Sequence, residues 1–381
     1  MTFMFEKWIH RQPVEIQAGP NASAGLENYI DGRKVLLVTT EGLIRRGAVE
    51  RLLAALPVAD WLTCPVPPNP ELDYLDAAAR LFREKEVGVV VAFGGGSAMD
   101  SAKAFAAALA GEVGWTLERH LNQKPGPPPL TAALPIYCLP TTAGTGAEVT
   151  PFATIWDMKR RKKLSLDDQC LYPRAAFLEP EWTISLPESE TRWGGLDAIS
   201  HALESLWSRR ASPVSLAWAR EALALVLEAL PQALVAPDNL TARASLQQSS
   251  LLAGLAISQN RTALAHAVSY PLTVHFGMPH GLACSFTLSA LVDLVTENEA
   301  WIRPGDAALA ARAVELLEGQ NLAGWLSAYV TQKEVMDLWA EMFTPGRADN
   351  FRVQMTKTSL KSVLQKSVNY NGSFTNCTVW R

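Results

Sequence analysis

Four side chains in the second half of the chain are typical of a divalent metal site. Asp197 and His201 are four residues apart, so a helix would present both on one face. His266 lies in an alanine-rich stretch predicted to be helical, and His280 stands at a predicted helix start after a turn. One carboxylate and three imidazoles suit Fe(II) or Zn(II) better than Mg(II) or Ca(II), and leave a coordination position open.

Spacing alone leaves a second interpretation of these residues open. A single histidine in an apolar helix is more often a buried core residue than a ligand. The carboxylate four residues before His201 shifts the balance toward a metal, and spacing leaves the two interpretations about even.

A glycine-rich turn in the first half is typical of a phosphate-binding site. Gly94–Gly96 follows a predicted apolar strand at 87–93, and Ser97 opens a predicted helix that continues to residue 110. Glycines let backbone N–H groups approach a phosphate, and the helix N-terminus adds partial positive charge. We expect a phosphate ligand here, although the turn is not a GxGxxG fingerprint. A second loop, 140–148, carries hydroxyls and glycines that suit ribose or nicotinamide, or form an ordinary polar loop.

The elements that would position these groups change in type near residue 185. Strands that are apolar on both sides and alternate with helices predict a parallel sheet covered on both faces. Long Ala/Leu-rich periodic stretches then predict a helical region. We therefore expect an α/β domain over 1–183, a helical metal-binding domain over 184–381, and a polar tail after one last helix. The expected strands are 34–39, 60–64, 87–93 and 135–139; the expected helices are 44–56, 72–86, 97–110, 193–209, 213–230 (ended by Pro231), 240–259, 307–330 and 358–368.

Composition limits the class of protein. With 34 basic and 38 acidic residues among 381, the net charge of −4 argues against a nucleic-acid or membrane-surface binder. Because no membrane span or signal peptide is evident, we expect a cytoplasmic protein. The 5 cysteines form no CxxC pair and none is set beside a histidine as a thiol nucleophile, so we expect buried thiols that pack as small hydrophobic groups. The basic run Lys159–Lys163, taken alone, is typical of a solvated turn.

Six segments together resemble the iron-containing (group III) alcohol dehydrogenase family, in family order over roughly residues 5–300. The resemblance implies a Rossmann-like NAD(P)-binding domain followed by an all-α domain, the dehydroquinate synthase-like fold, with an active site in the cleft between them. The segments are Pro68–Pro70, Gly94–Lys103, Pro140–Thr150, Gly195–Glu204, Ala265–His266 and Pro279–Gly281.

The same resemblance implies the ligand set and the partners. Fe²⁺, or alternatively Zn²⁺, would be held by Asp197, His201, His266 and His280, and NADPH or NADH would be the cofactor. The substrate would be a small aldehyde or alcohol, and the protein a homodimer or a larger homo-oligomer. The positions expected to contact the cofactor are Thr40, Gly94, Gly95, Gly96, Ser97, Asp100, Thr141, Thr142 and Lys163.

Two positions depart from the family pattern. Many members carry a second histidine four residues after the third metal ligand, often assigned to proton relay, and Tyr270 occupies that place here. We consider Tyr270 as a proton donor, beside a route from solvent through the cofactor ribose, because an unperturbed tyrosine with a pKa of about 10 is a reluctant acid. Thr40 stands where NAD-preferring members carry Asp, and the missing carboxylate favours NADPH or dual use.

A narrower resemblance is to the phosphonoacetaldehyde reductase branch, carried by Thr150–Asp157, Lys162–Ser165, Ile257–Thr262 and His266–Leu272. It implies reduction of phosphonoacetaldehyde to 2-hydroxyethylphosphonate. Arg261, five residues before His266, suits a phosphonate dianion as a bidentate donor, or equally forms an ordinary salt bridge. Arg192 and Lys357 are further, less supported candidates for the same role. The alternatives are a dehydrogenase of ordinary short-chain alcohols, a non-redox enzyme resembling dehydroquinate synthase, and a nucleotide-binding sensor without turnover.

Overall fold

The computed structural model describes residues 7–56, 60–123, 126–303, 305–343 and 347–369. The chain divides into two compact units, which we describe separately. The sheet unit consists of Gln12–Pro187 and Asp238–Gln247, and the helical unit of Glu188–Pro237, the chain from Gln248 onward and the segment before Gln12. Among the described residues, no helix combines the length and the apolar character that a membrane crossing requires.

Six parallel strands form the core of the sheet unit, in the order β1-β8-β5-β4-β2-β3. Every residue of β2, β4, β5 and β8 is buried, as expected for a parallel sheet covered on both faces. The strands are β1 (Glu15–Ala18), β2 (Val35–Thr39), β3 (Trp61–Pro65), β4 (Val89–Gly94), β5 (Ile136–Pro140) and β8 (Ala175–Leu178).

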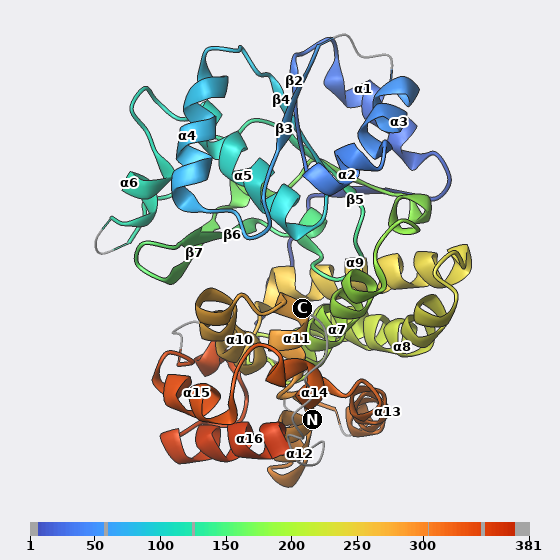
Figure 1. The fold of residues 1–381 in the computed structure, drawn as a ribbon, viewed down its shortest axis with the longest axis vertical. Coiled ribbons are helices and arrows are strands. Elements are labelled where there is room, and N and C mark those ends of the chain that lie inside the picture. The colour runs from blue at the N-terminus through green and yellow to red at the C-terminus, as the bar shows by residue number, and fades with distance from the viewer. Residues whose placement is uncertain (1–6, 57–59, 124–125, 304, 344–346, 370–381) are drawn as a thin grey trace. The chain divides into compact units, whose positions relative to one another are not determined.

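Helices cover the two faces of the sheet (Figure 1), and alternate strand residues pack against one layer or the other. Leu36 and Val90 pack with α4 and α5 on one face, whereas Leu37 and Val91 pack with α1 and α3 on the other. Helices on both faces explain why the strands read as unbroken apolar runs. The helices of this unit are α1 (Glu27–Ile30), α2 (Glu41–Arg45), α3 (Ala48–Ala55), α4 (Leu72–Arg83), α5 (Gly96–Ala110) and α6 (Leu117–Leu121), with short 3₁₀ turns η2 (Ala22–Leu26), η3 (Ala147–Val149), η4 (Gln169–Leu171) and η5 (Pro180–Thr183).

Several elements of this unit differ from the sequence-based expectation. One helix was expected over 44–56, but Gly47 has a φ of 68° and separates α2 from α3. The basic run joins an antiparallel hairpin that was not predicted, β6 (Phe152–Asp157) with β7 (Lys162–Asp167). Arg160 in its turn donates to Asp157 Oδ2 at 2.6 Å.

The helical unit contains the long helices that the sequence predicted, with two corrections. The prediction that Pro231 ends a helix is wrong, because α8 continues to Val235 with Pro231 inside it. A proline within a helix removes one backbone hydrogen bond and can kink the helix without ending it. The stretch 307–330 is two helices, because Asn321 has a φ of 50°. The elements are α7 (Glu188–Leu206), α8 (Pro213–Val235), α9 (Leu240–Asn260), α10 (Leu264–Phe276), α11 (His280–Ser285), α12 (Leu288–Glu297), α13 (Asp306–Glu318), α14 (Leu322–Ser327), α15 (Gln332–Asp337), η6 (Leu338–Ala340), η7 (Ala348–Asn350) and α16 (Lys357–Asn369). The part of α9 up to Gln247 belongs to the sheet unit. The expected polar tail lies outside the described residues from 370 on.

Candidate functional site

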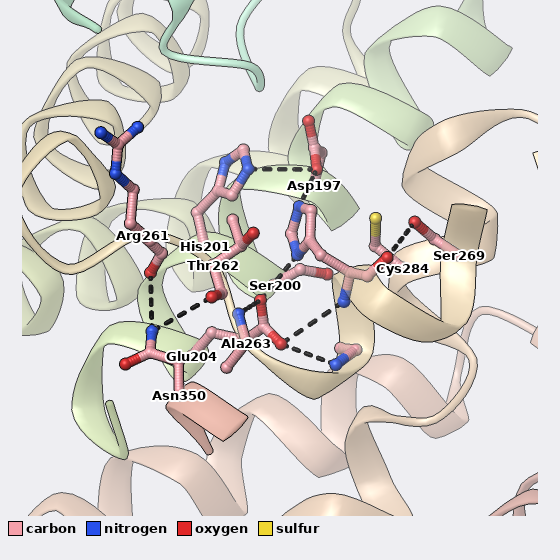
Figure 2. A network of polar contacts seen from close by, with 12 residues as sticks. Asp197, Ser200, His201, Glu204, Arg261, Thr262, Ala263, Ser269, Cys284 and Asn350 are labelled. Atoms are coloured by element: carbon pink, nitrogen blue, oxygen red, sulfur yellow. Dashed lines mark hydrogen bonds and ion pairs between the residues drawn. The ribbon is translucent and has the colours of Figure 1, made fainter. Parts of the chain in front are cut away.

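Three histidines surround one carboxylate oxygen of Asp197 in the helical unit, and Figure 2 shows this carboxylate beside His201. Asp197 Oδ1 lies 3.6 Å from His201 Nε2, 3.5 Å from His266 Nε2 and 3.8 Å from His280 Nε2. Asp197, His201 and His266 are buried, whereas the His280 side chain is 35% exposed, so this donor cluster is open on the side of His280. The structure therefore brings together the four side chains that the sequence singled out. We call them the donor cluster.

Close packing between three helices positions the donor cluster. Asp197 and His201 are one turn apart on α7, His266 lies in α10, and His280 is the first residue of α11. Gly281 follows it, and a Cβ there would lie 1.9 Å from the carbonyl oxygen of Trp193 on α7. Only glycine permits this backbone approach, so Gly281 is what lets α11 bring His280 up to Asp197.

The residues present fit a divalent cation. Asp197 Oδ1 and His266 Nε2 are both buried, and neither makes a hydrogen bond to any residue in the described ranges. Burial would raise the pKa of the Asp197 carboxyl, but the neighbouring His201, His280 and His266 hold that pKa well below its usual value. Two ligands about 2.1 Å from one tetrahedral Zn²⁺ lie about 3.4 Å apart, close to the separations observed here. A cation would satisfy both orphaned atoms.

Glu204 is a functional residue that the sequence reasoning missed. Its carboxylate is fully buried on α7 and accepts hydrogen bonds from the backbone N–H groups of Ala263 at 2.8 Å and Ala265 at 2.6 Å, at the start of α10. It also contacts His266 Nδ1 at 2.7 Å (Figure 2). A carboxylate at Nδ1 keeps the proton on that nitrogen, so Nε2 is the nitrogen left to bind a cation. Glu204 follows His201 by three residues, and this helical spacing was the available signal.

Cys284 is buried, as expected of the cysteines, but it also lies beside a histidine. Its Sγ lies 3.4 Å from His280 Nε2, one turn away on α11. Its Sγ and ligand atoms of Asp197, His266 and His280 all lie within 4.8 Å of one another. Burial raises the pKa of the Cys284 thiol. The spacing of four residues from His280 was readable in the sequence.

In the sheet unit, three loops meet at the carboxyl ends of β3, β4 and β5. Asn69 N donates to Ser97 Oγ at 3.1 Å, and Thr141 N donates to the Gly94 carbonyl oxygen at 3.0 Å. A Cβ at Gly95 would lie 2.9 Å from the Thr142 side chain, so glycine is needed for these loops to approach. We call the segments 65–70, 94–97 and 140–146 the nucleotide loops.

The strand order supports a ligand site at this edge. β2 pairs with β3 on one side and with β4 on the other, so the direction of chain progression reverses between β2 and β4. Ligands of open parallel sheets bind outside the carboxyl ends of the strands at such a reversal. Thr40, which follows β2, and Gly94–Gly96, where β4 becomes α5, stand at this place.

Asp100 and Lys163 lie near each other beside the nucleotide loops. Asp100 Oδ2 accepts a hydrogen bond from the backbone N–H of Thr154 at 2.9 Å. Burial raises the pKa of the Asp100 carboxyl, and the ammonium groups of Lys103 and Lys163 oppose that rise. Burial likewise raises the pKa of Glu148 to about 7. The fully buried Lys103 is close enough to both carboxylates for its charge to act on them, and it donates hydrogen bonds to the backbone at Ala147 and Phe152.

Arg261 and Tyr270 lie on either side of His266 in the chain. Arg261 follows α9 with a φ of 64°, a conformation that favours glycine, and Asn350 Nδ2 holds this turn through the carbonyl oxygens of Asn260 at 2.9 Å and Thr262 at 3.1 Å. In Figure 2 the Arg261 side chain rises from this turn next to His201. Tyr270 is buried in α10, one turn after His266.

Comparison with known proteins gives the family. The model of the iron-containing alcohol dehydrogenases matches residues 13–180, and that of the C-terminal region of the Fe-containing alcohol dehydrogenase family matches residues 191–378. The phosphonoacetaldehyde reductase of Streptomyces viridochromogenes is 42% identical over 224 residues, which span 58% of this chain and 56% of that protein. The 1-propanol dehydrogenase of Salmonella typhimurium is 32% identical over 279 residues, 73% of this chain and 70% of that protein.

Two solved structures are similar to this chain over almost its whole length. The sulfoacetaldehyde reductase of Bifidobacterium kashiwanohense, solved in complex with NAD⁺, superposes with a TM-score of 0.83 at 29% identity, over 96% of this chain and 99% of that chain. A 1,3-propanediol oxidoreductase superposes with a TM-score of 0.83 at 25% identity, over 95% of this chain and 100% of that chain. The donor cluster and the nucleotide loops thus stand in a fold shared with these oxidoreductases, and the chain belongs to the iron-containing alcohol dehydrogenase family.

Proposed function

We propose that this protein reduces phosphonoacetaldehyde to 2-hydroxyethylphosphonate, using NADPH or NADH and a divalent metal ion held by the donor cluster. The observation that carries the metal-dependent chemistry is the meeting of three imidazoles on Asp197 Oδ1, with two buried atoms left without a hydrogen bond among the described residues. The substrate is supported by the similarity to the Streptomyces reductase.

When bound, the reduced nicotinamide would supply the hydride that the aldehyde carbon gains, and the carbonyl oxygen would gain a proton. When bound, Fe²⁺ or Zn²⁺ supplies a Lewis acid for that oxygen. Asp197, His201, His266 and His280 hold the ion, and the exposed side of His280 leaves room for substrate. We propose Tyr270, one turn after His266, as the proton donor.

The nucleotide loops would bind the dinucleotide. The backbone N–H groups of Gly95 and Gly96 at the start of α5 would face the pyrophosphate, and Ser97, Thr141 and Thr142 would contact it from the adjoining turns. Thr40 presents no carboxylate to a 2′-phosphate, which supports use of NADPH as well as NADH.

Arg261 would bind the phosphonate group. Two of the similar proteins, the phosphonoacetaldehyde and sulfoacetaldehyde reductases, carry names of aldehydes with a tetrahedral anionic group. A guanidinium matches two oxygens of such a group at once, and a non-glycine residue in the left-handed region carries a backbone cost of about 1 kcal/mol or more. Retaining arginine at a φ of 64° therefore favours a role for its side chain.

The substrate assignment predicts a change in discrimination for Arg261→Ala. Loss of a charge-assisted hydrogen-bond pair, about 1.5–3 kcal/mol, should lower kcat/KM for phosphonoacetaldehyde by about 10- to 150-fold and leave propanal nearly unchanged. The measurement follows NADPH and NADH oxidation with both aldehydes by the Fe(II)-loaded protein under anaerobic conditions.

Arg192→Ala is the control, because the guanidinium of Arg192, which is only partly exposed on α7, is engaged by Glu188 and Gln320 and should leave the ratio unchanged. Equal or better turnover of propanal by the unaltered protein would replace the phosphonate substrate by ordinary short-chain aldehydes, the second candidate, which the 1-propanol dehydrogenase of Salmonella supports.

The proposed metal site also predicts an effect of Glu204→Gln. The glutamine amide lacks the negative charge with which the Glu204 carboxylate accepts hydrogen bonds from His266 Nδ1 and two backbone N–H groups. His266 would then be oriented less well, so we expect the Zn(II) dissociation constant to rise by about 10- to 100-fold. Competition with a chromophoric chelator measures it. Glu188→Gln, on the exposed first turn of the same helix, is the control. An unchanged dissociation constant in Glu204→Gln would contradict the positioning role.

A further inference from the structure

A thiol lies among the atoms of the proposed metal site. Cys284 Sγ is 3.4 Å from His280 Nε2 and 3.6 Å from His280 Nδ1. With ligand atoms of Asp197 and His266, these atoms form a group whose members all lie within 4.8 Å of one another. A thiolate about 2.3 Å and an imidazole nitrogen about 2.0 Å from one tetrahedral Zn²⁺ are about 3.5 Å apart. The observed separation therefore matches two ligands of one ion.

A second observation concerns two other atoms of the same group. Asp197 Oδ1 and His266 Nε2 are buried and form no hydrogen bond with any residue that the structure describes. Both atoms belong to the set that contains Cys284. A cation that satisfies these two atoms would lie within reach of Sγ as well.

Local structure fixes the thiol in this place. His280 and Cys284 are one turn apart on α11, so they share a helix face. The close approach of Gly281 to the Trp193 backbone lets this helix pack directly on α7, which carries Asp197. Cys284 is fully buried, so packed neighbours enclose its side chain beside the group.

From this geometry we infer that Cys284 is a further ligand of the proposed metal site, as a thiolate that binds alongside Asp197, His266 and His280. The inference rests on the proposed metal-dependent function. Binding releases the thiol proton to solvent as the S–metal bond forms, with no change in oxidation state. A soft sulfur donor shifts the preference of an otherwise O/N site toward Zn(II). We therefore expect Cys284→Ser to raise the dissociation constant for Zn(II) by about tenfold or more, and that for Fe(II) by less.

Cobalt(II) substitution tests the inference without an activity assay. The metal-free protein is titrated with Co(II) under anaerobic conditions. We expect visible d–d bands from the bound ion together with a near-ultraviolet sulfur-to-cobalt charge-transfer band. Cys284→Ser and Cys284→Ala should lose the near-ultraviolet band and retain the visible ones. Cys138→Ser, a buried thiol of β5 in the sheet unit, is the matched control and should keep both.

The outcomes separate this inference from the proposed function. Visible bands without a near-ultraviolet band in the unaltered protein, or a near-ultraviolet band that survives in both Cys284 variants, would overturn the thiolate ligand and leave the metal site standing. No spectral change on adding Co(II) would overturn the metal site and the thiolate ligand together.

Discussion

His266→Ala should lose bound metal and reductase activity together. His266 Nε2 faces Asp197 Oδ1 at 3.5 Å, and its Nδ1 is the contact through which Glu204 orients the ring. A catalytic metal ion stabilises the transition state by several kcal/mol, and a loss of about 4 kcal/mol lowers the reaction rate roughly a thousandfold. We therefore expect kcat/KM to fall by about a thousandfold or more, and the metal content after dialysis to fall with it. Metal analysis and NADPH oxidation on the same preparation measure both.

The chain offers a matched control on the same helix. His275 also lies in α10, but its Nε2 contacts Glu341 at 2.9 Å, away from the donor cluster. His275→Ala should keep metal and activity. Because removing His266 leaves the buried Glu204 with one partner fewer, His280→Ala serves as a second variant, at the most exposed member of the cluster. Full activity in a metal-free His266→Ala or His280→Ala protein would reject the ligand assignment.

Local signals were sufficient for the parts of the candidate site that lie within one element. Asp197 and His201 are one turn apart, and Gly94–Gly96 joins an apolar strand to a helix, so both follow from helix and strand periodicity. The six segments that resemble the iron-containing alcohol dehydrogenases predicted the fold and the expected set of metal ligands. The six-stranded sheet and its helices confirm the α/β fold class, and the similar structures confirm the family fold.

Contacts between distant segments could not be predicted in this way. Glu204 caps the start of α10 from α7, about sixty residues earlier, and no local pattern predicts that pairing. β1 and β8 are four residues long and join the sheet only through tertiary pairing with each other and β5. The hairpin β6–β7 was not predicted, because the basic run between its strands is typical of a solvated turn. Cys284 shows the opposite case, because its spacing from His280 was visible but general cysteine statistics favoured a packing role.

Lys103→Met should be the most destabilising of the variants considered in the sheet unit. Lys103 is fully buried on α5, and its Nζ donates to the carbonyl oxygens of Ala147 at 2.7 Å and Phe152 at 2.8 Å and to Thr150 Oγ1 at 3.0 Å. Methionine matches the length of the side chain but leaves these acceptors buried without a donor. It also removes the positive charge that opposes the rise in the pKa of Asp100. We expect a loss of about 3–5 kcal/mol in the free energy of unfolding.

The same substitution should weaken dinucleotide binding, because Lys103 ties α5 to the segment that directly follows the loop bearing Thr141 and Thr142. Denaturant titration measures the stability, hydrogen exchange at 147–152 locates the loss, and NADPH fluorescence titration measures the affinity. Lys333→Met is the control, since Lys333 is exposed and pairs only at the surface with Asp337, where such a pair contributes about 0–1 kcal/mol. If Lys103→Met were as stable as this control, the three hydrogen bonds would not hold the loop, and the positions of Thr141 and Thr142 would depend on the nucleotide itself.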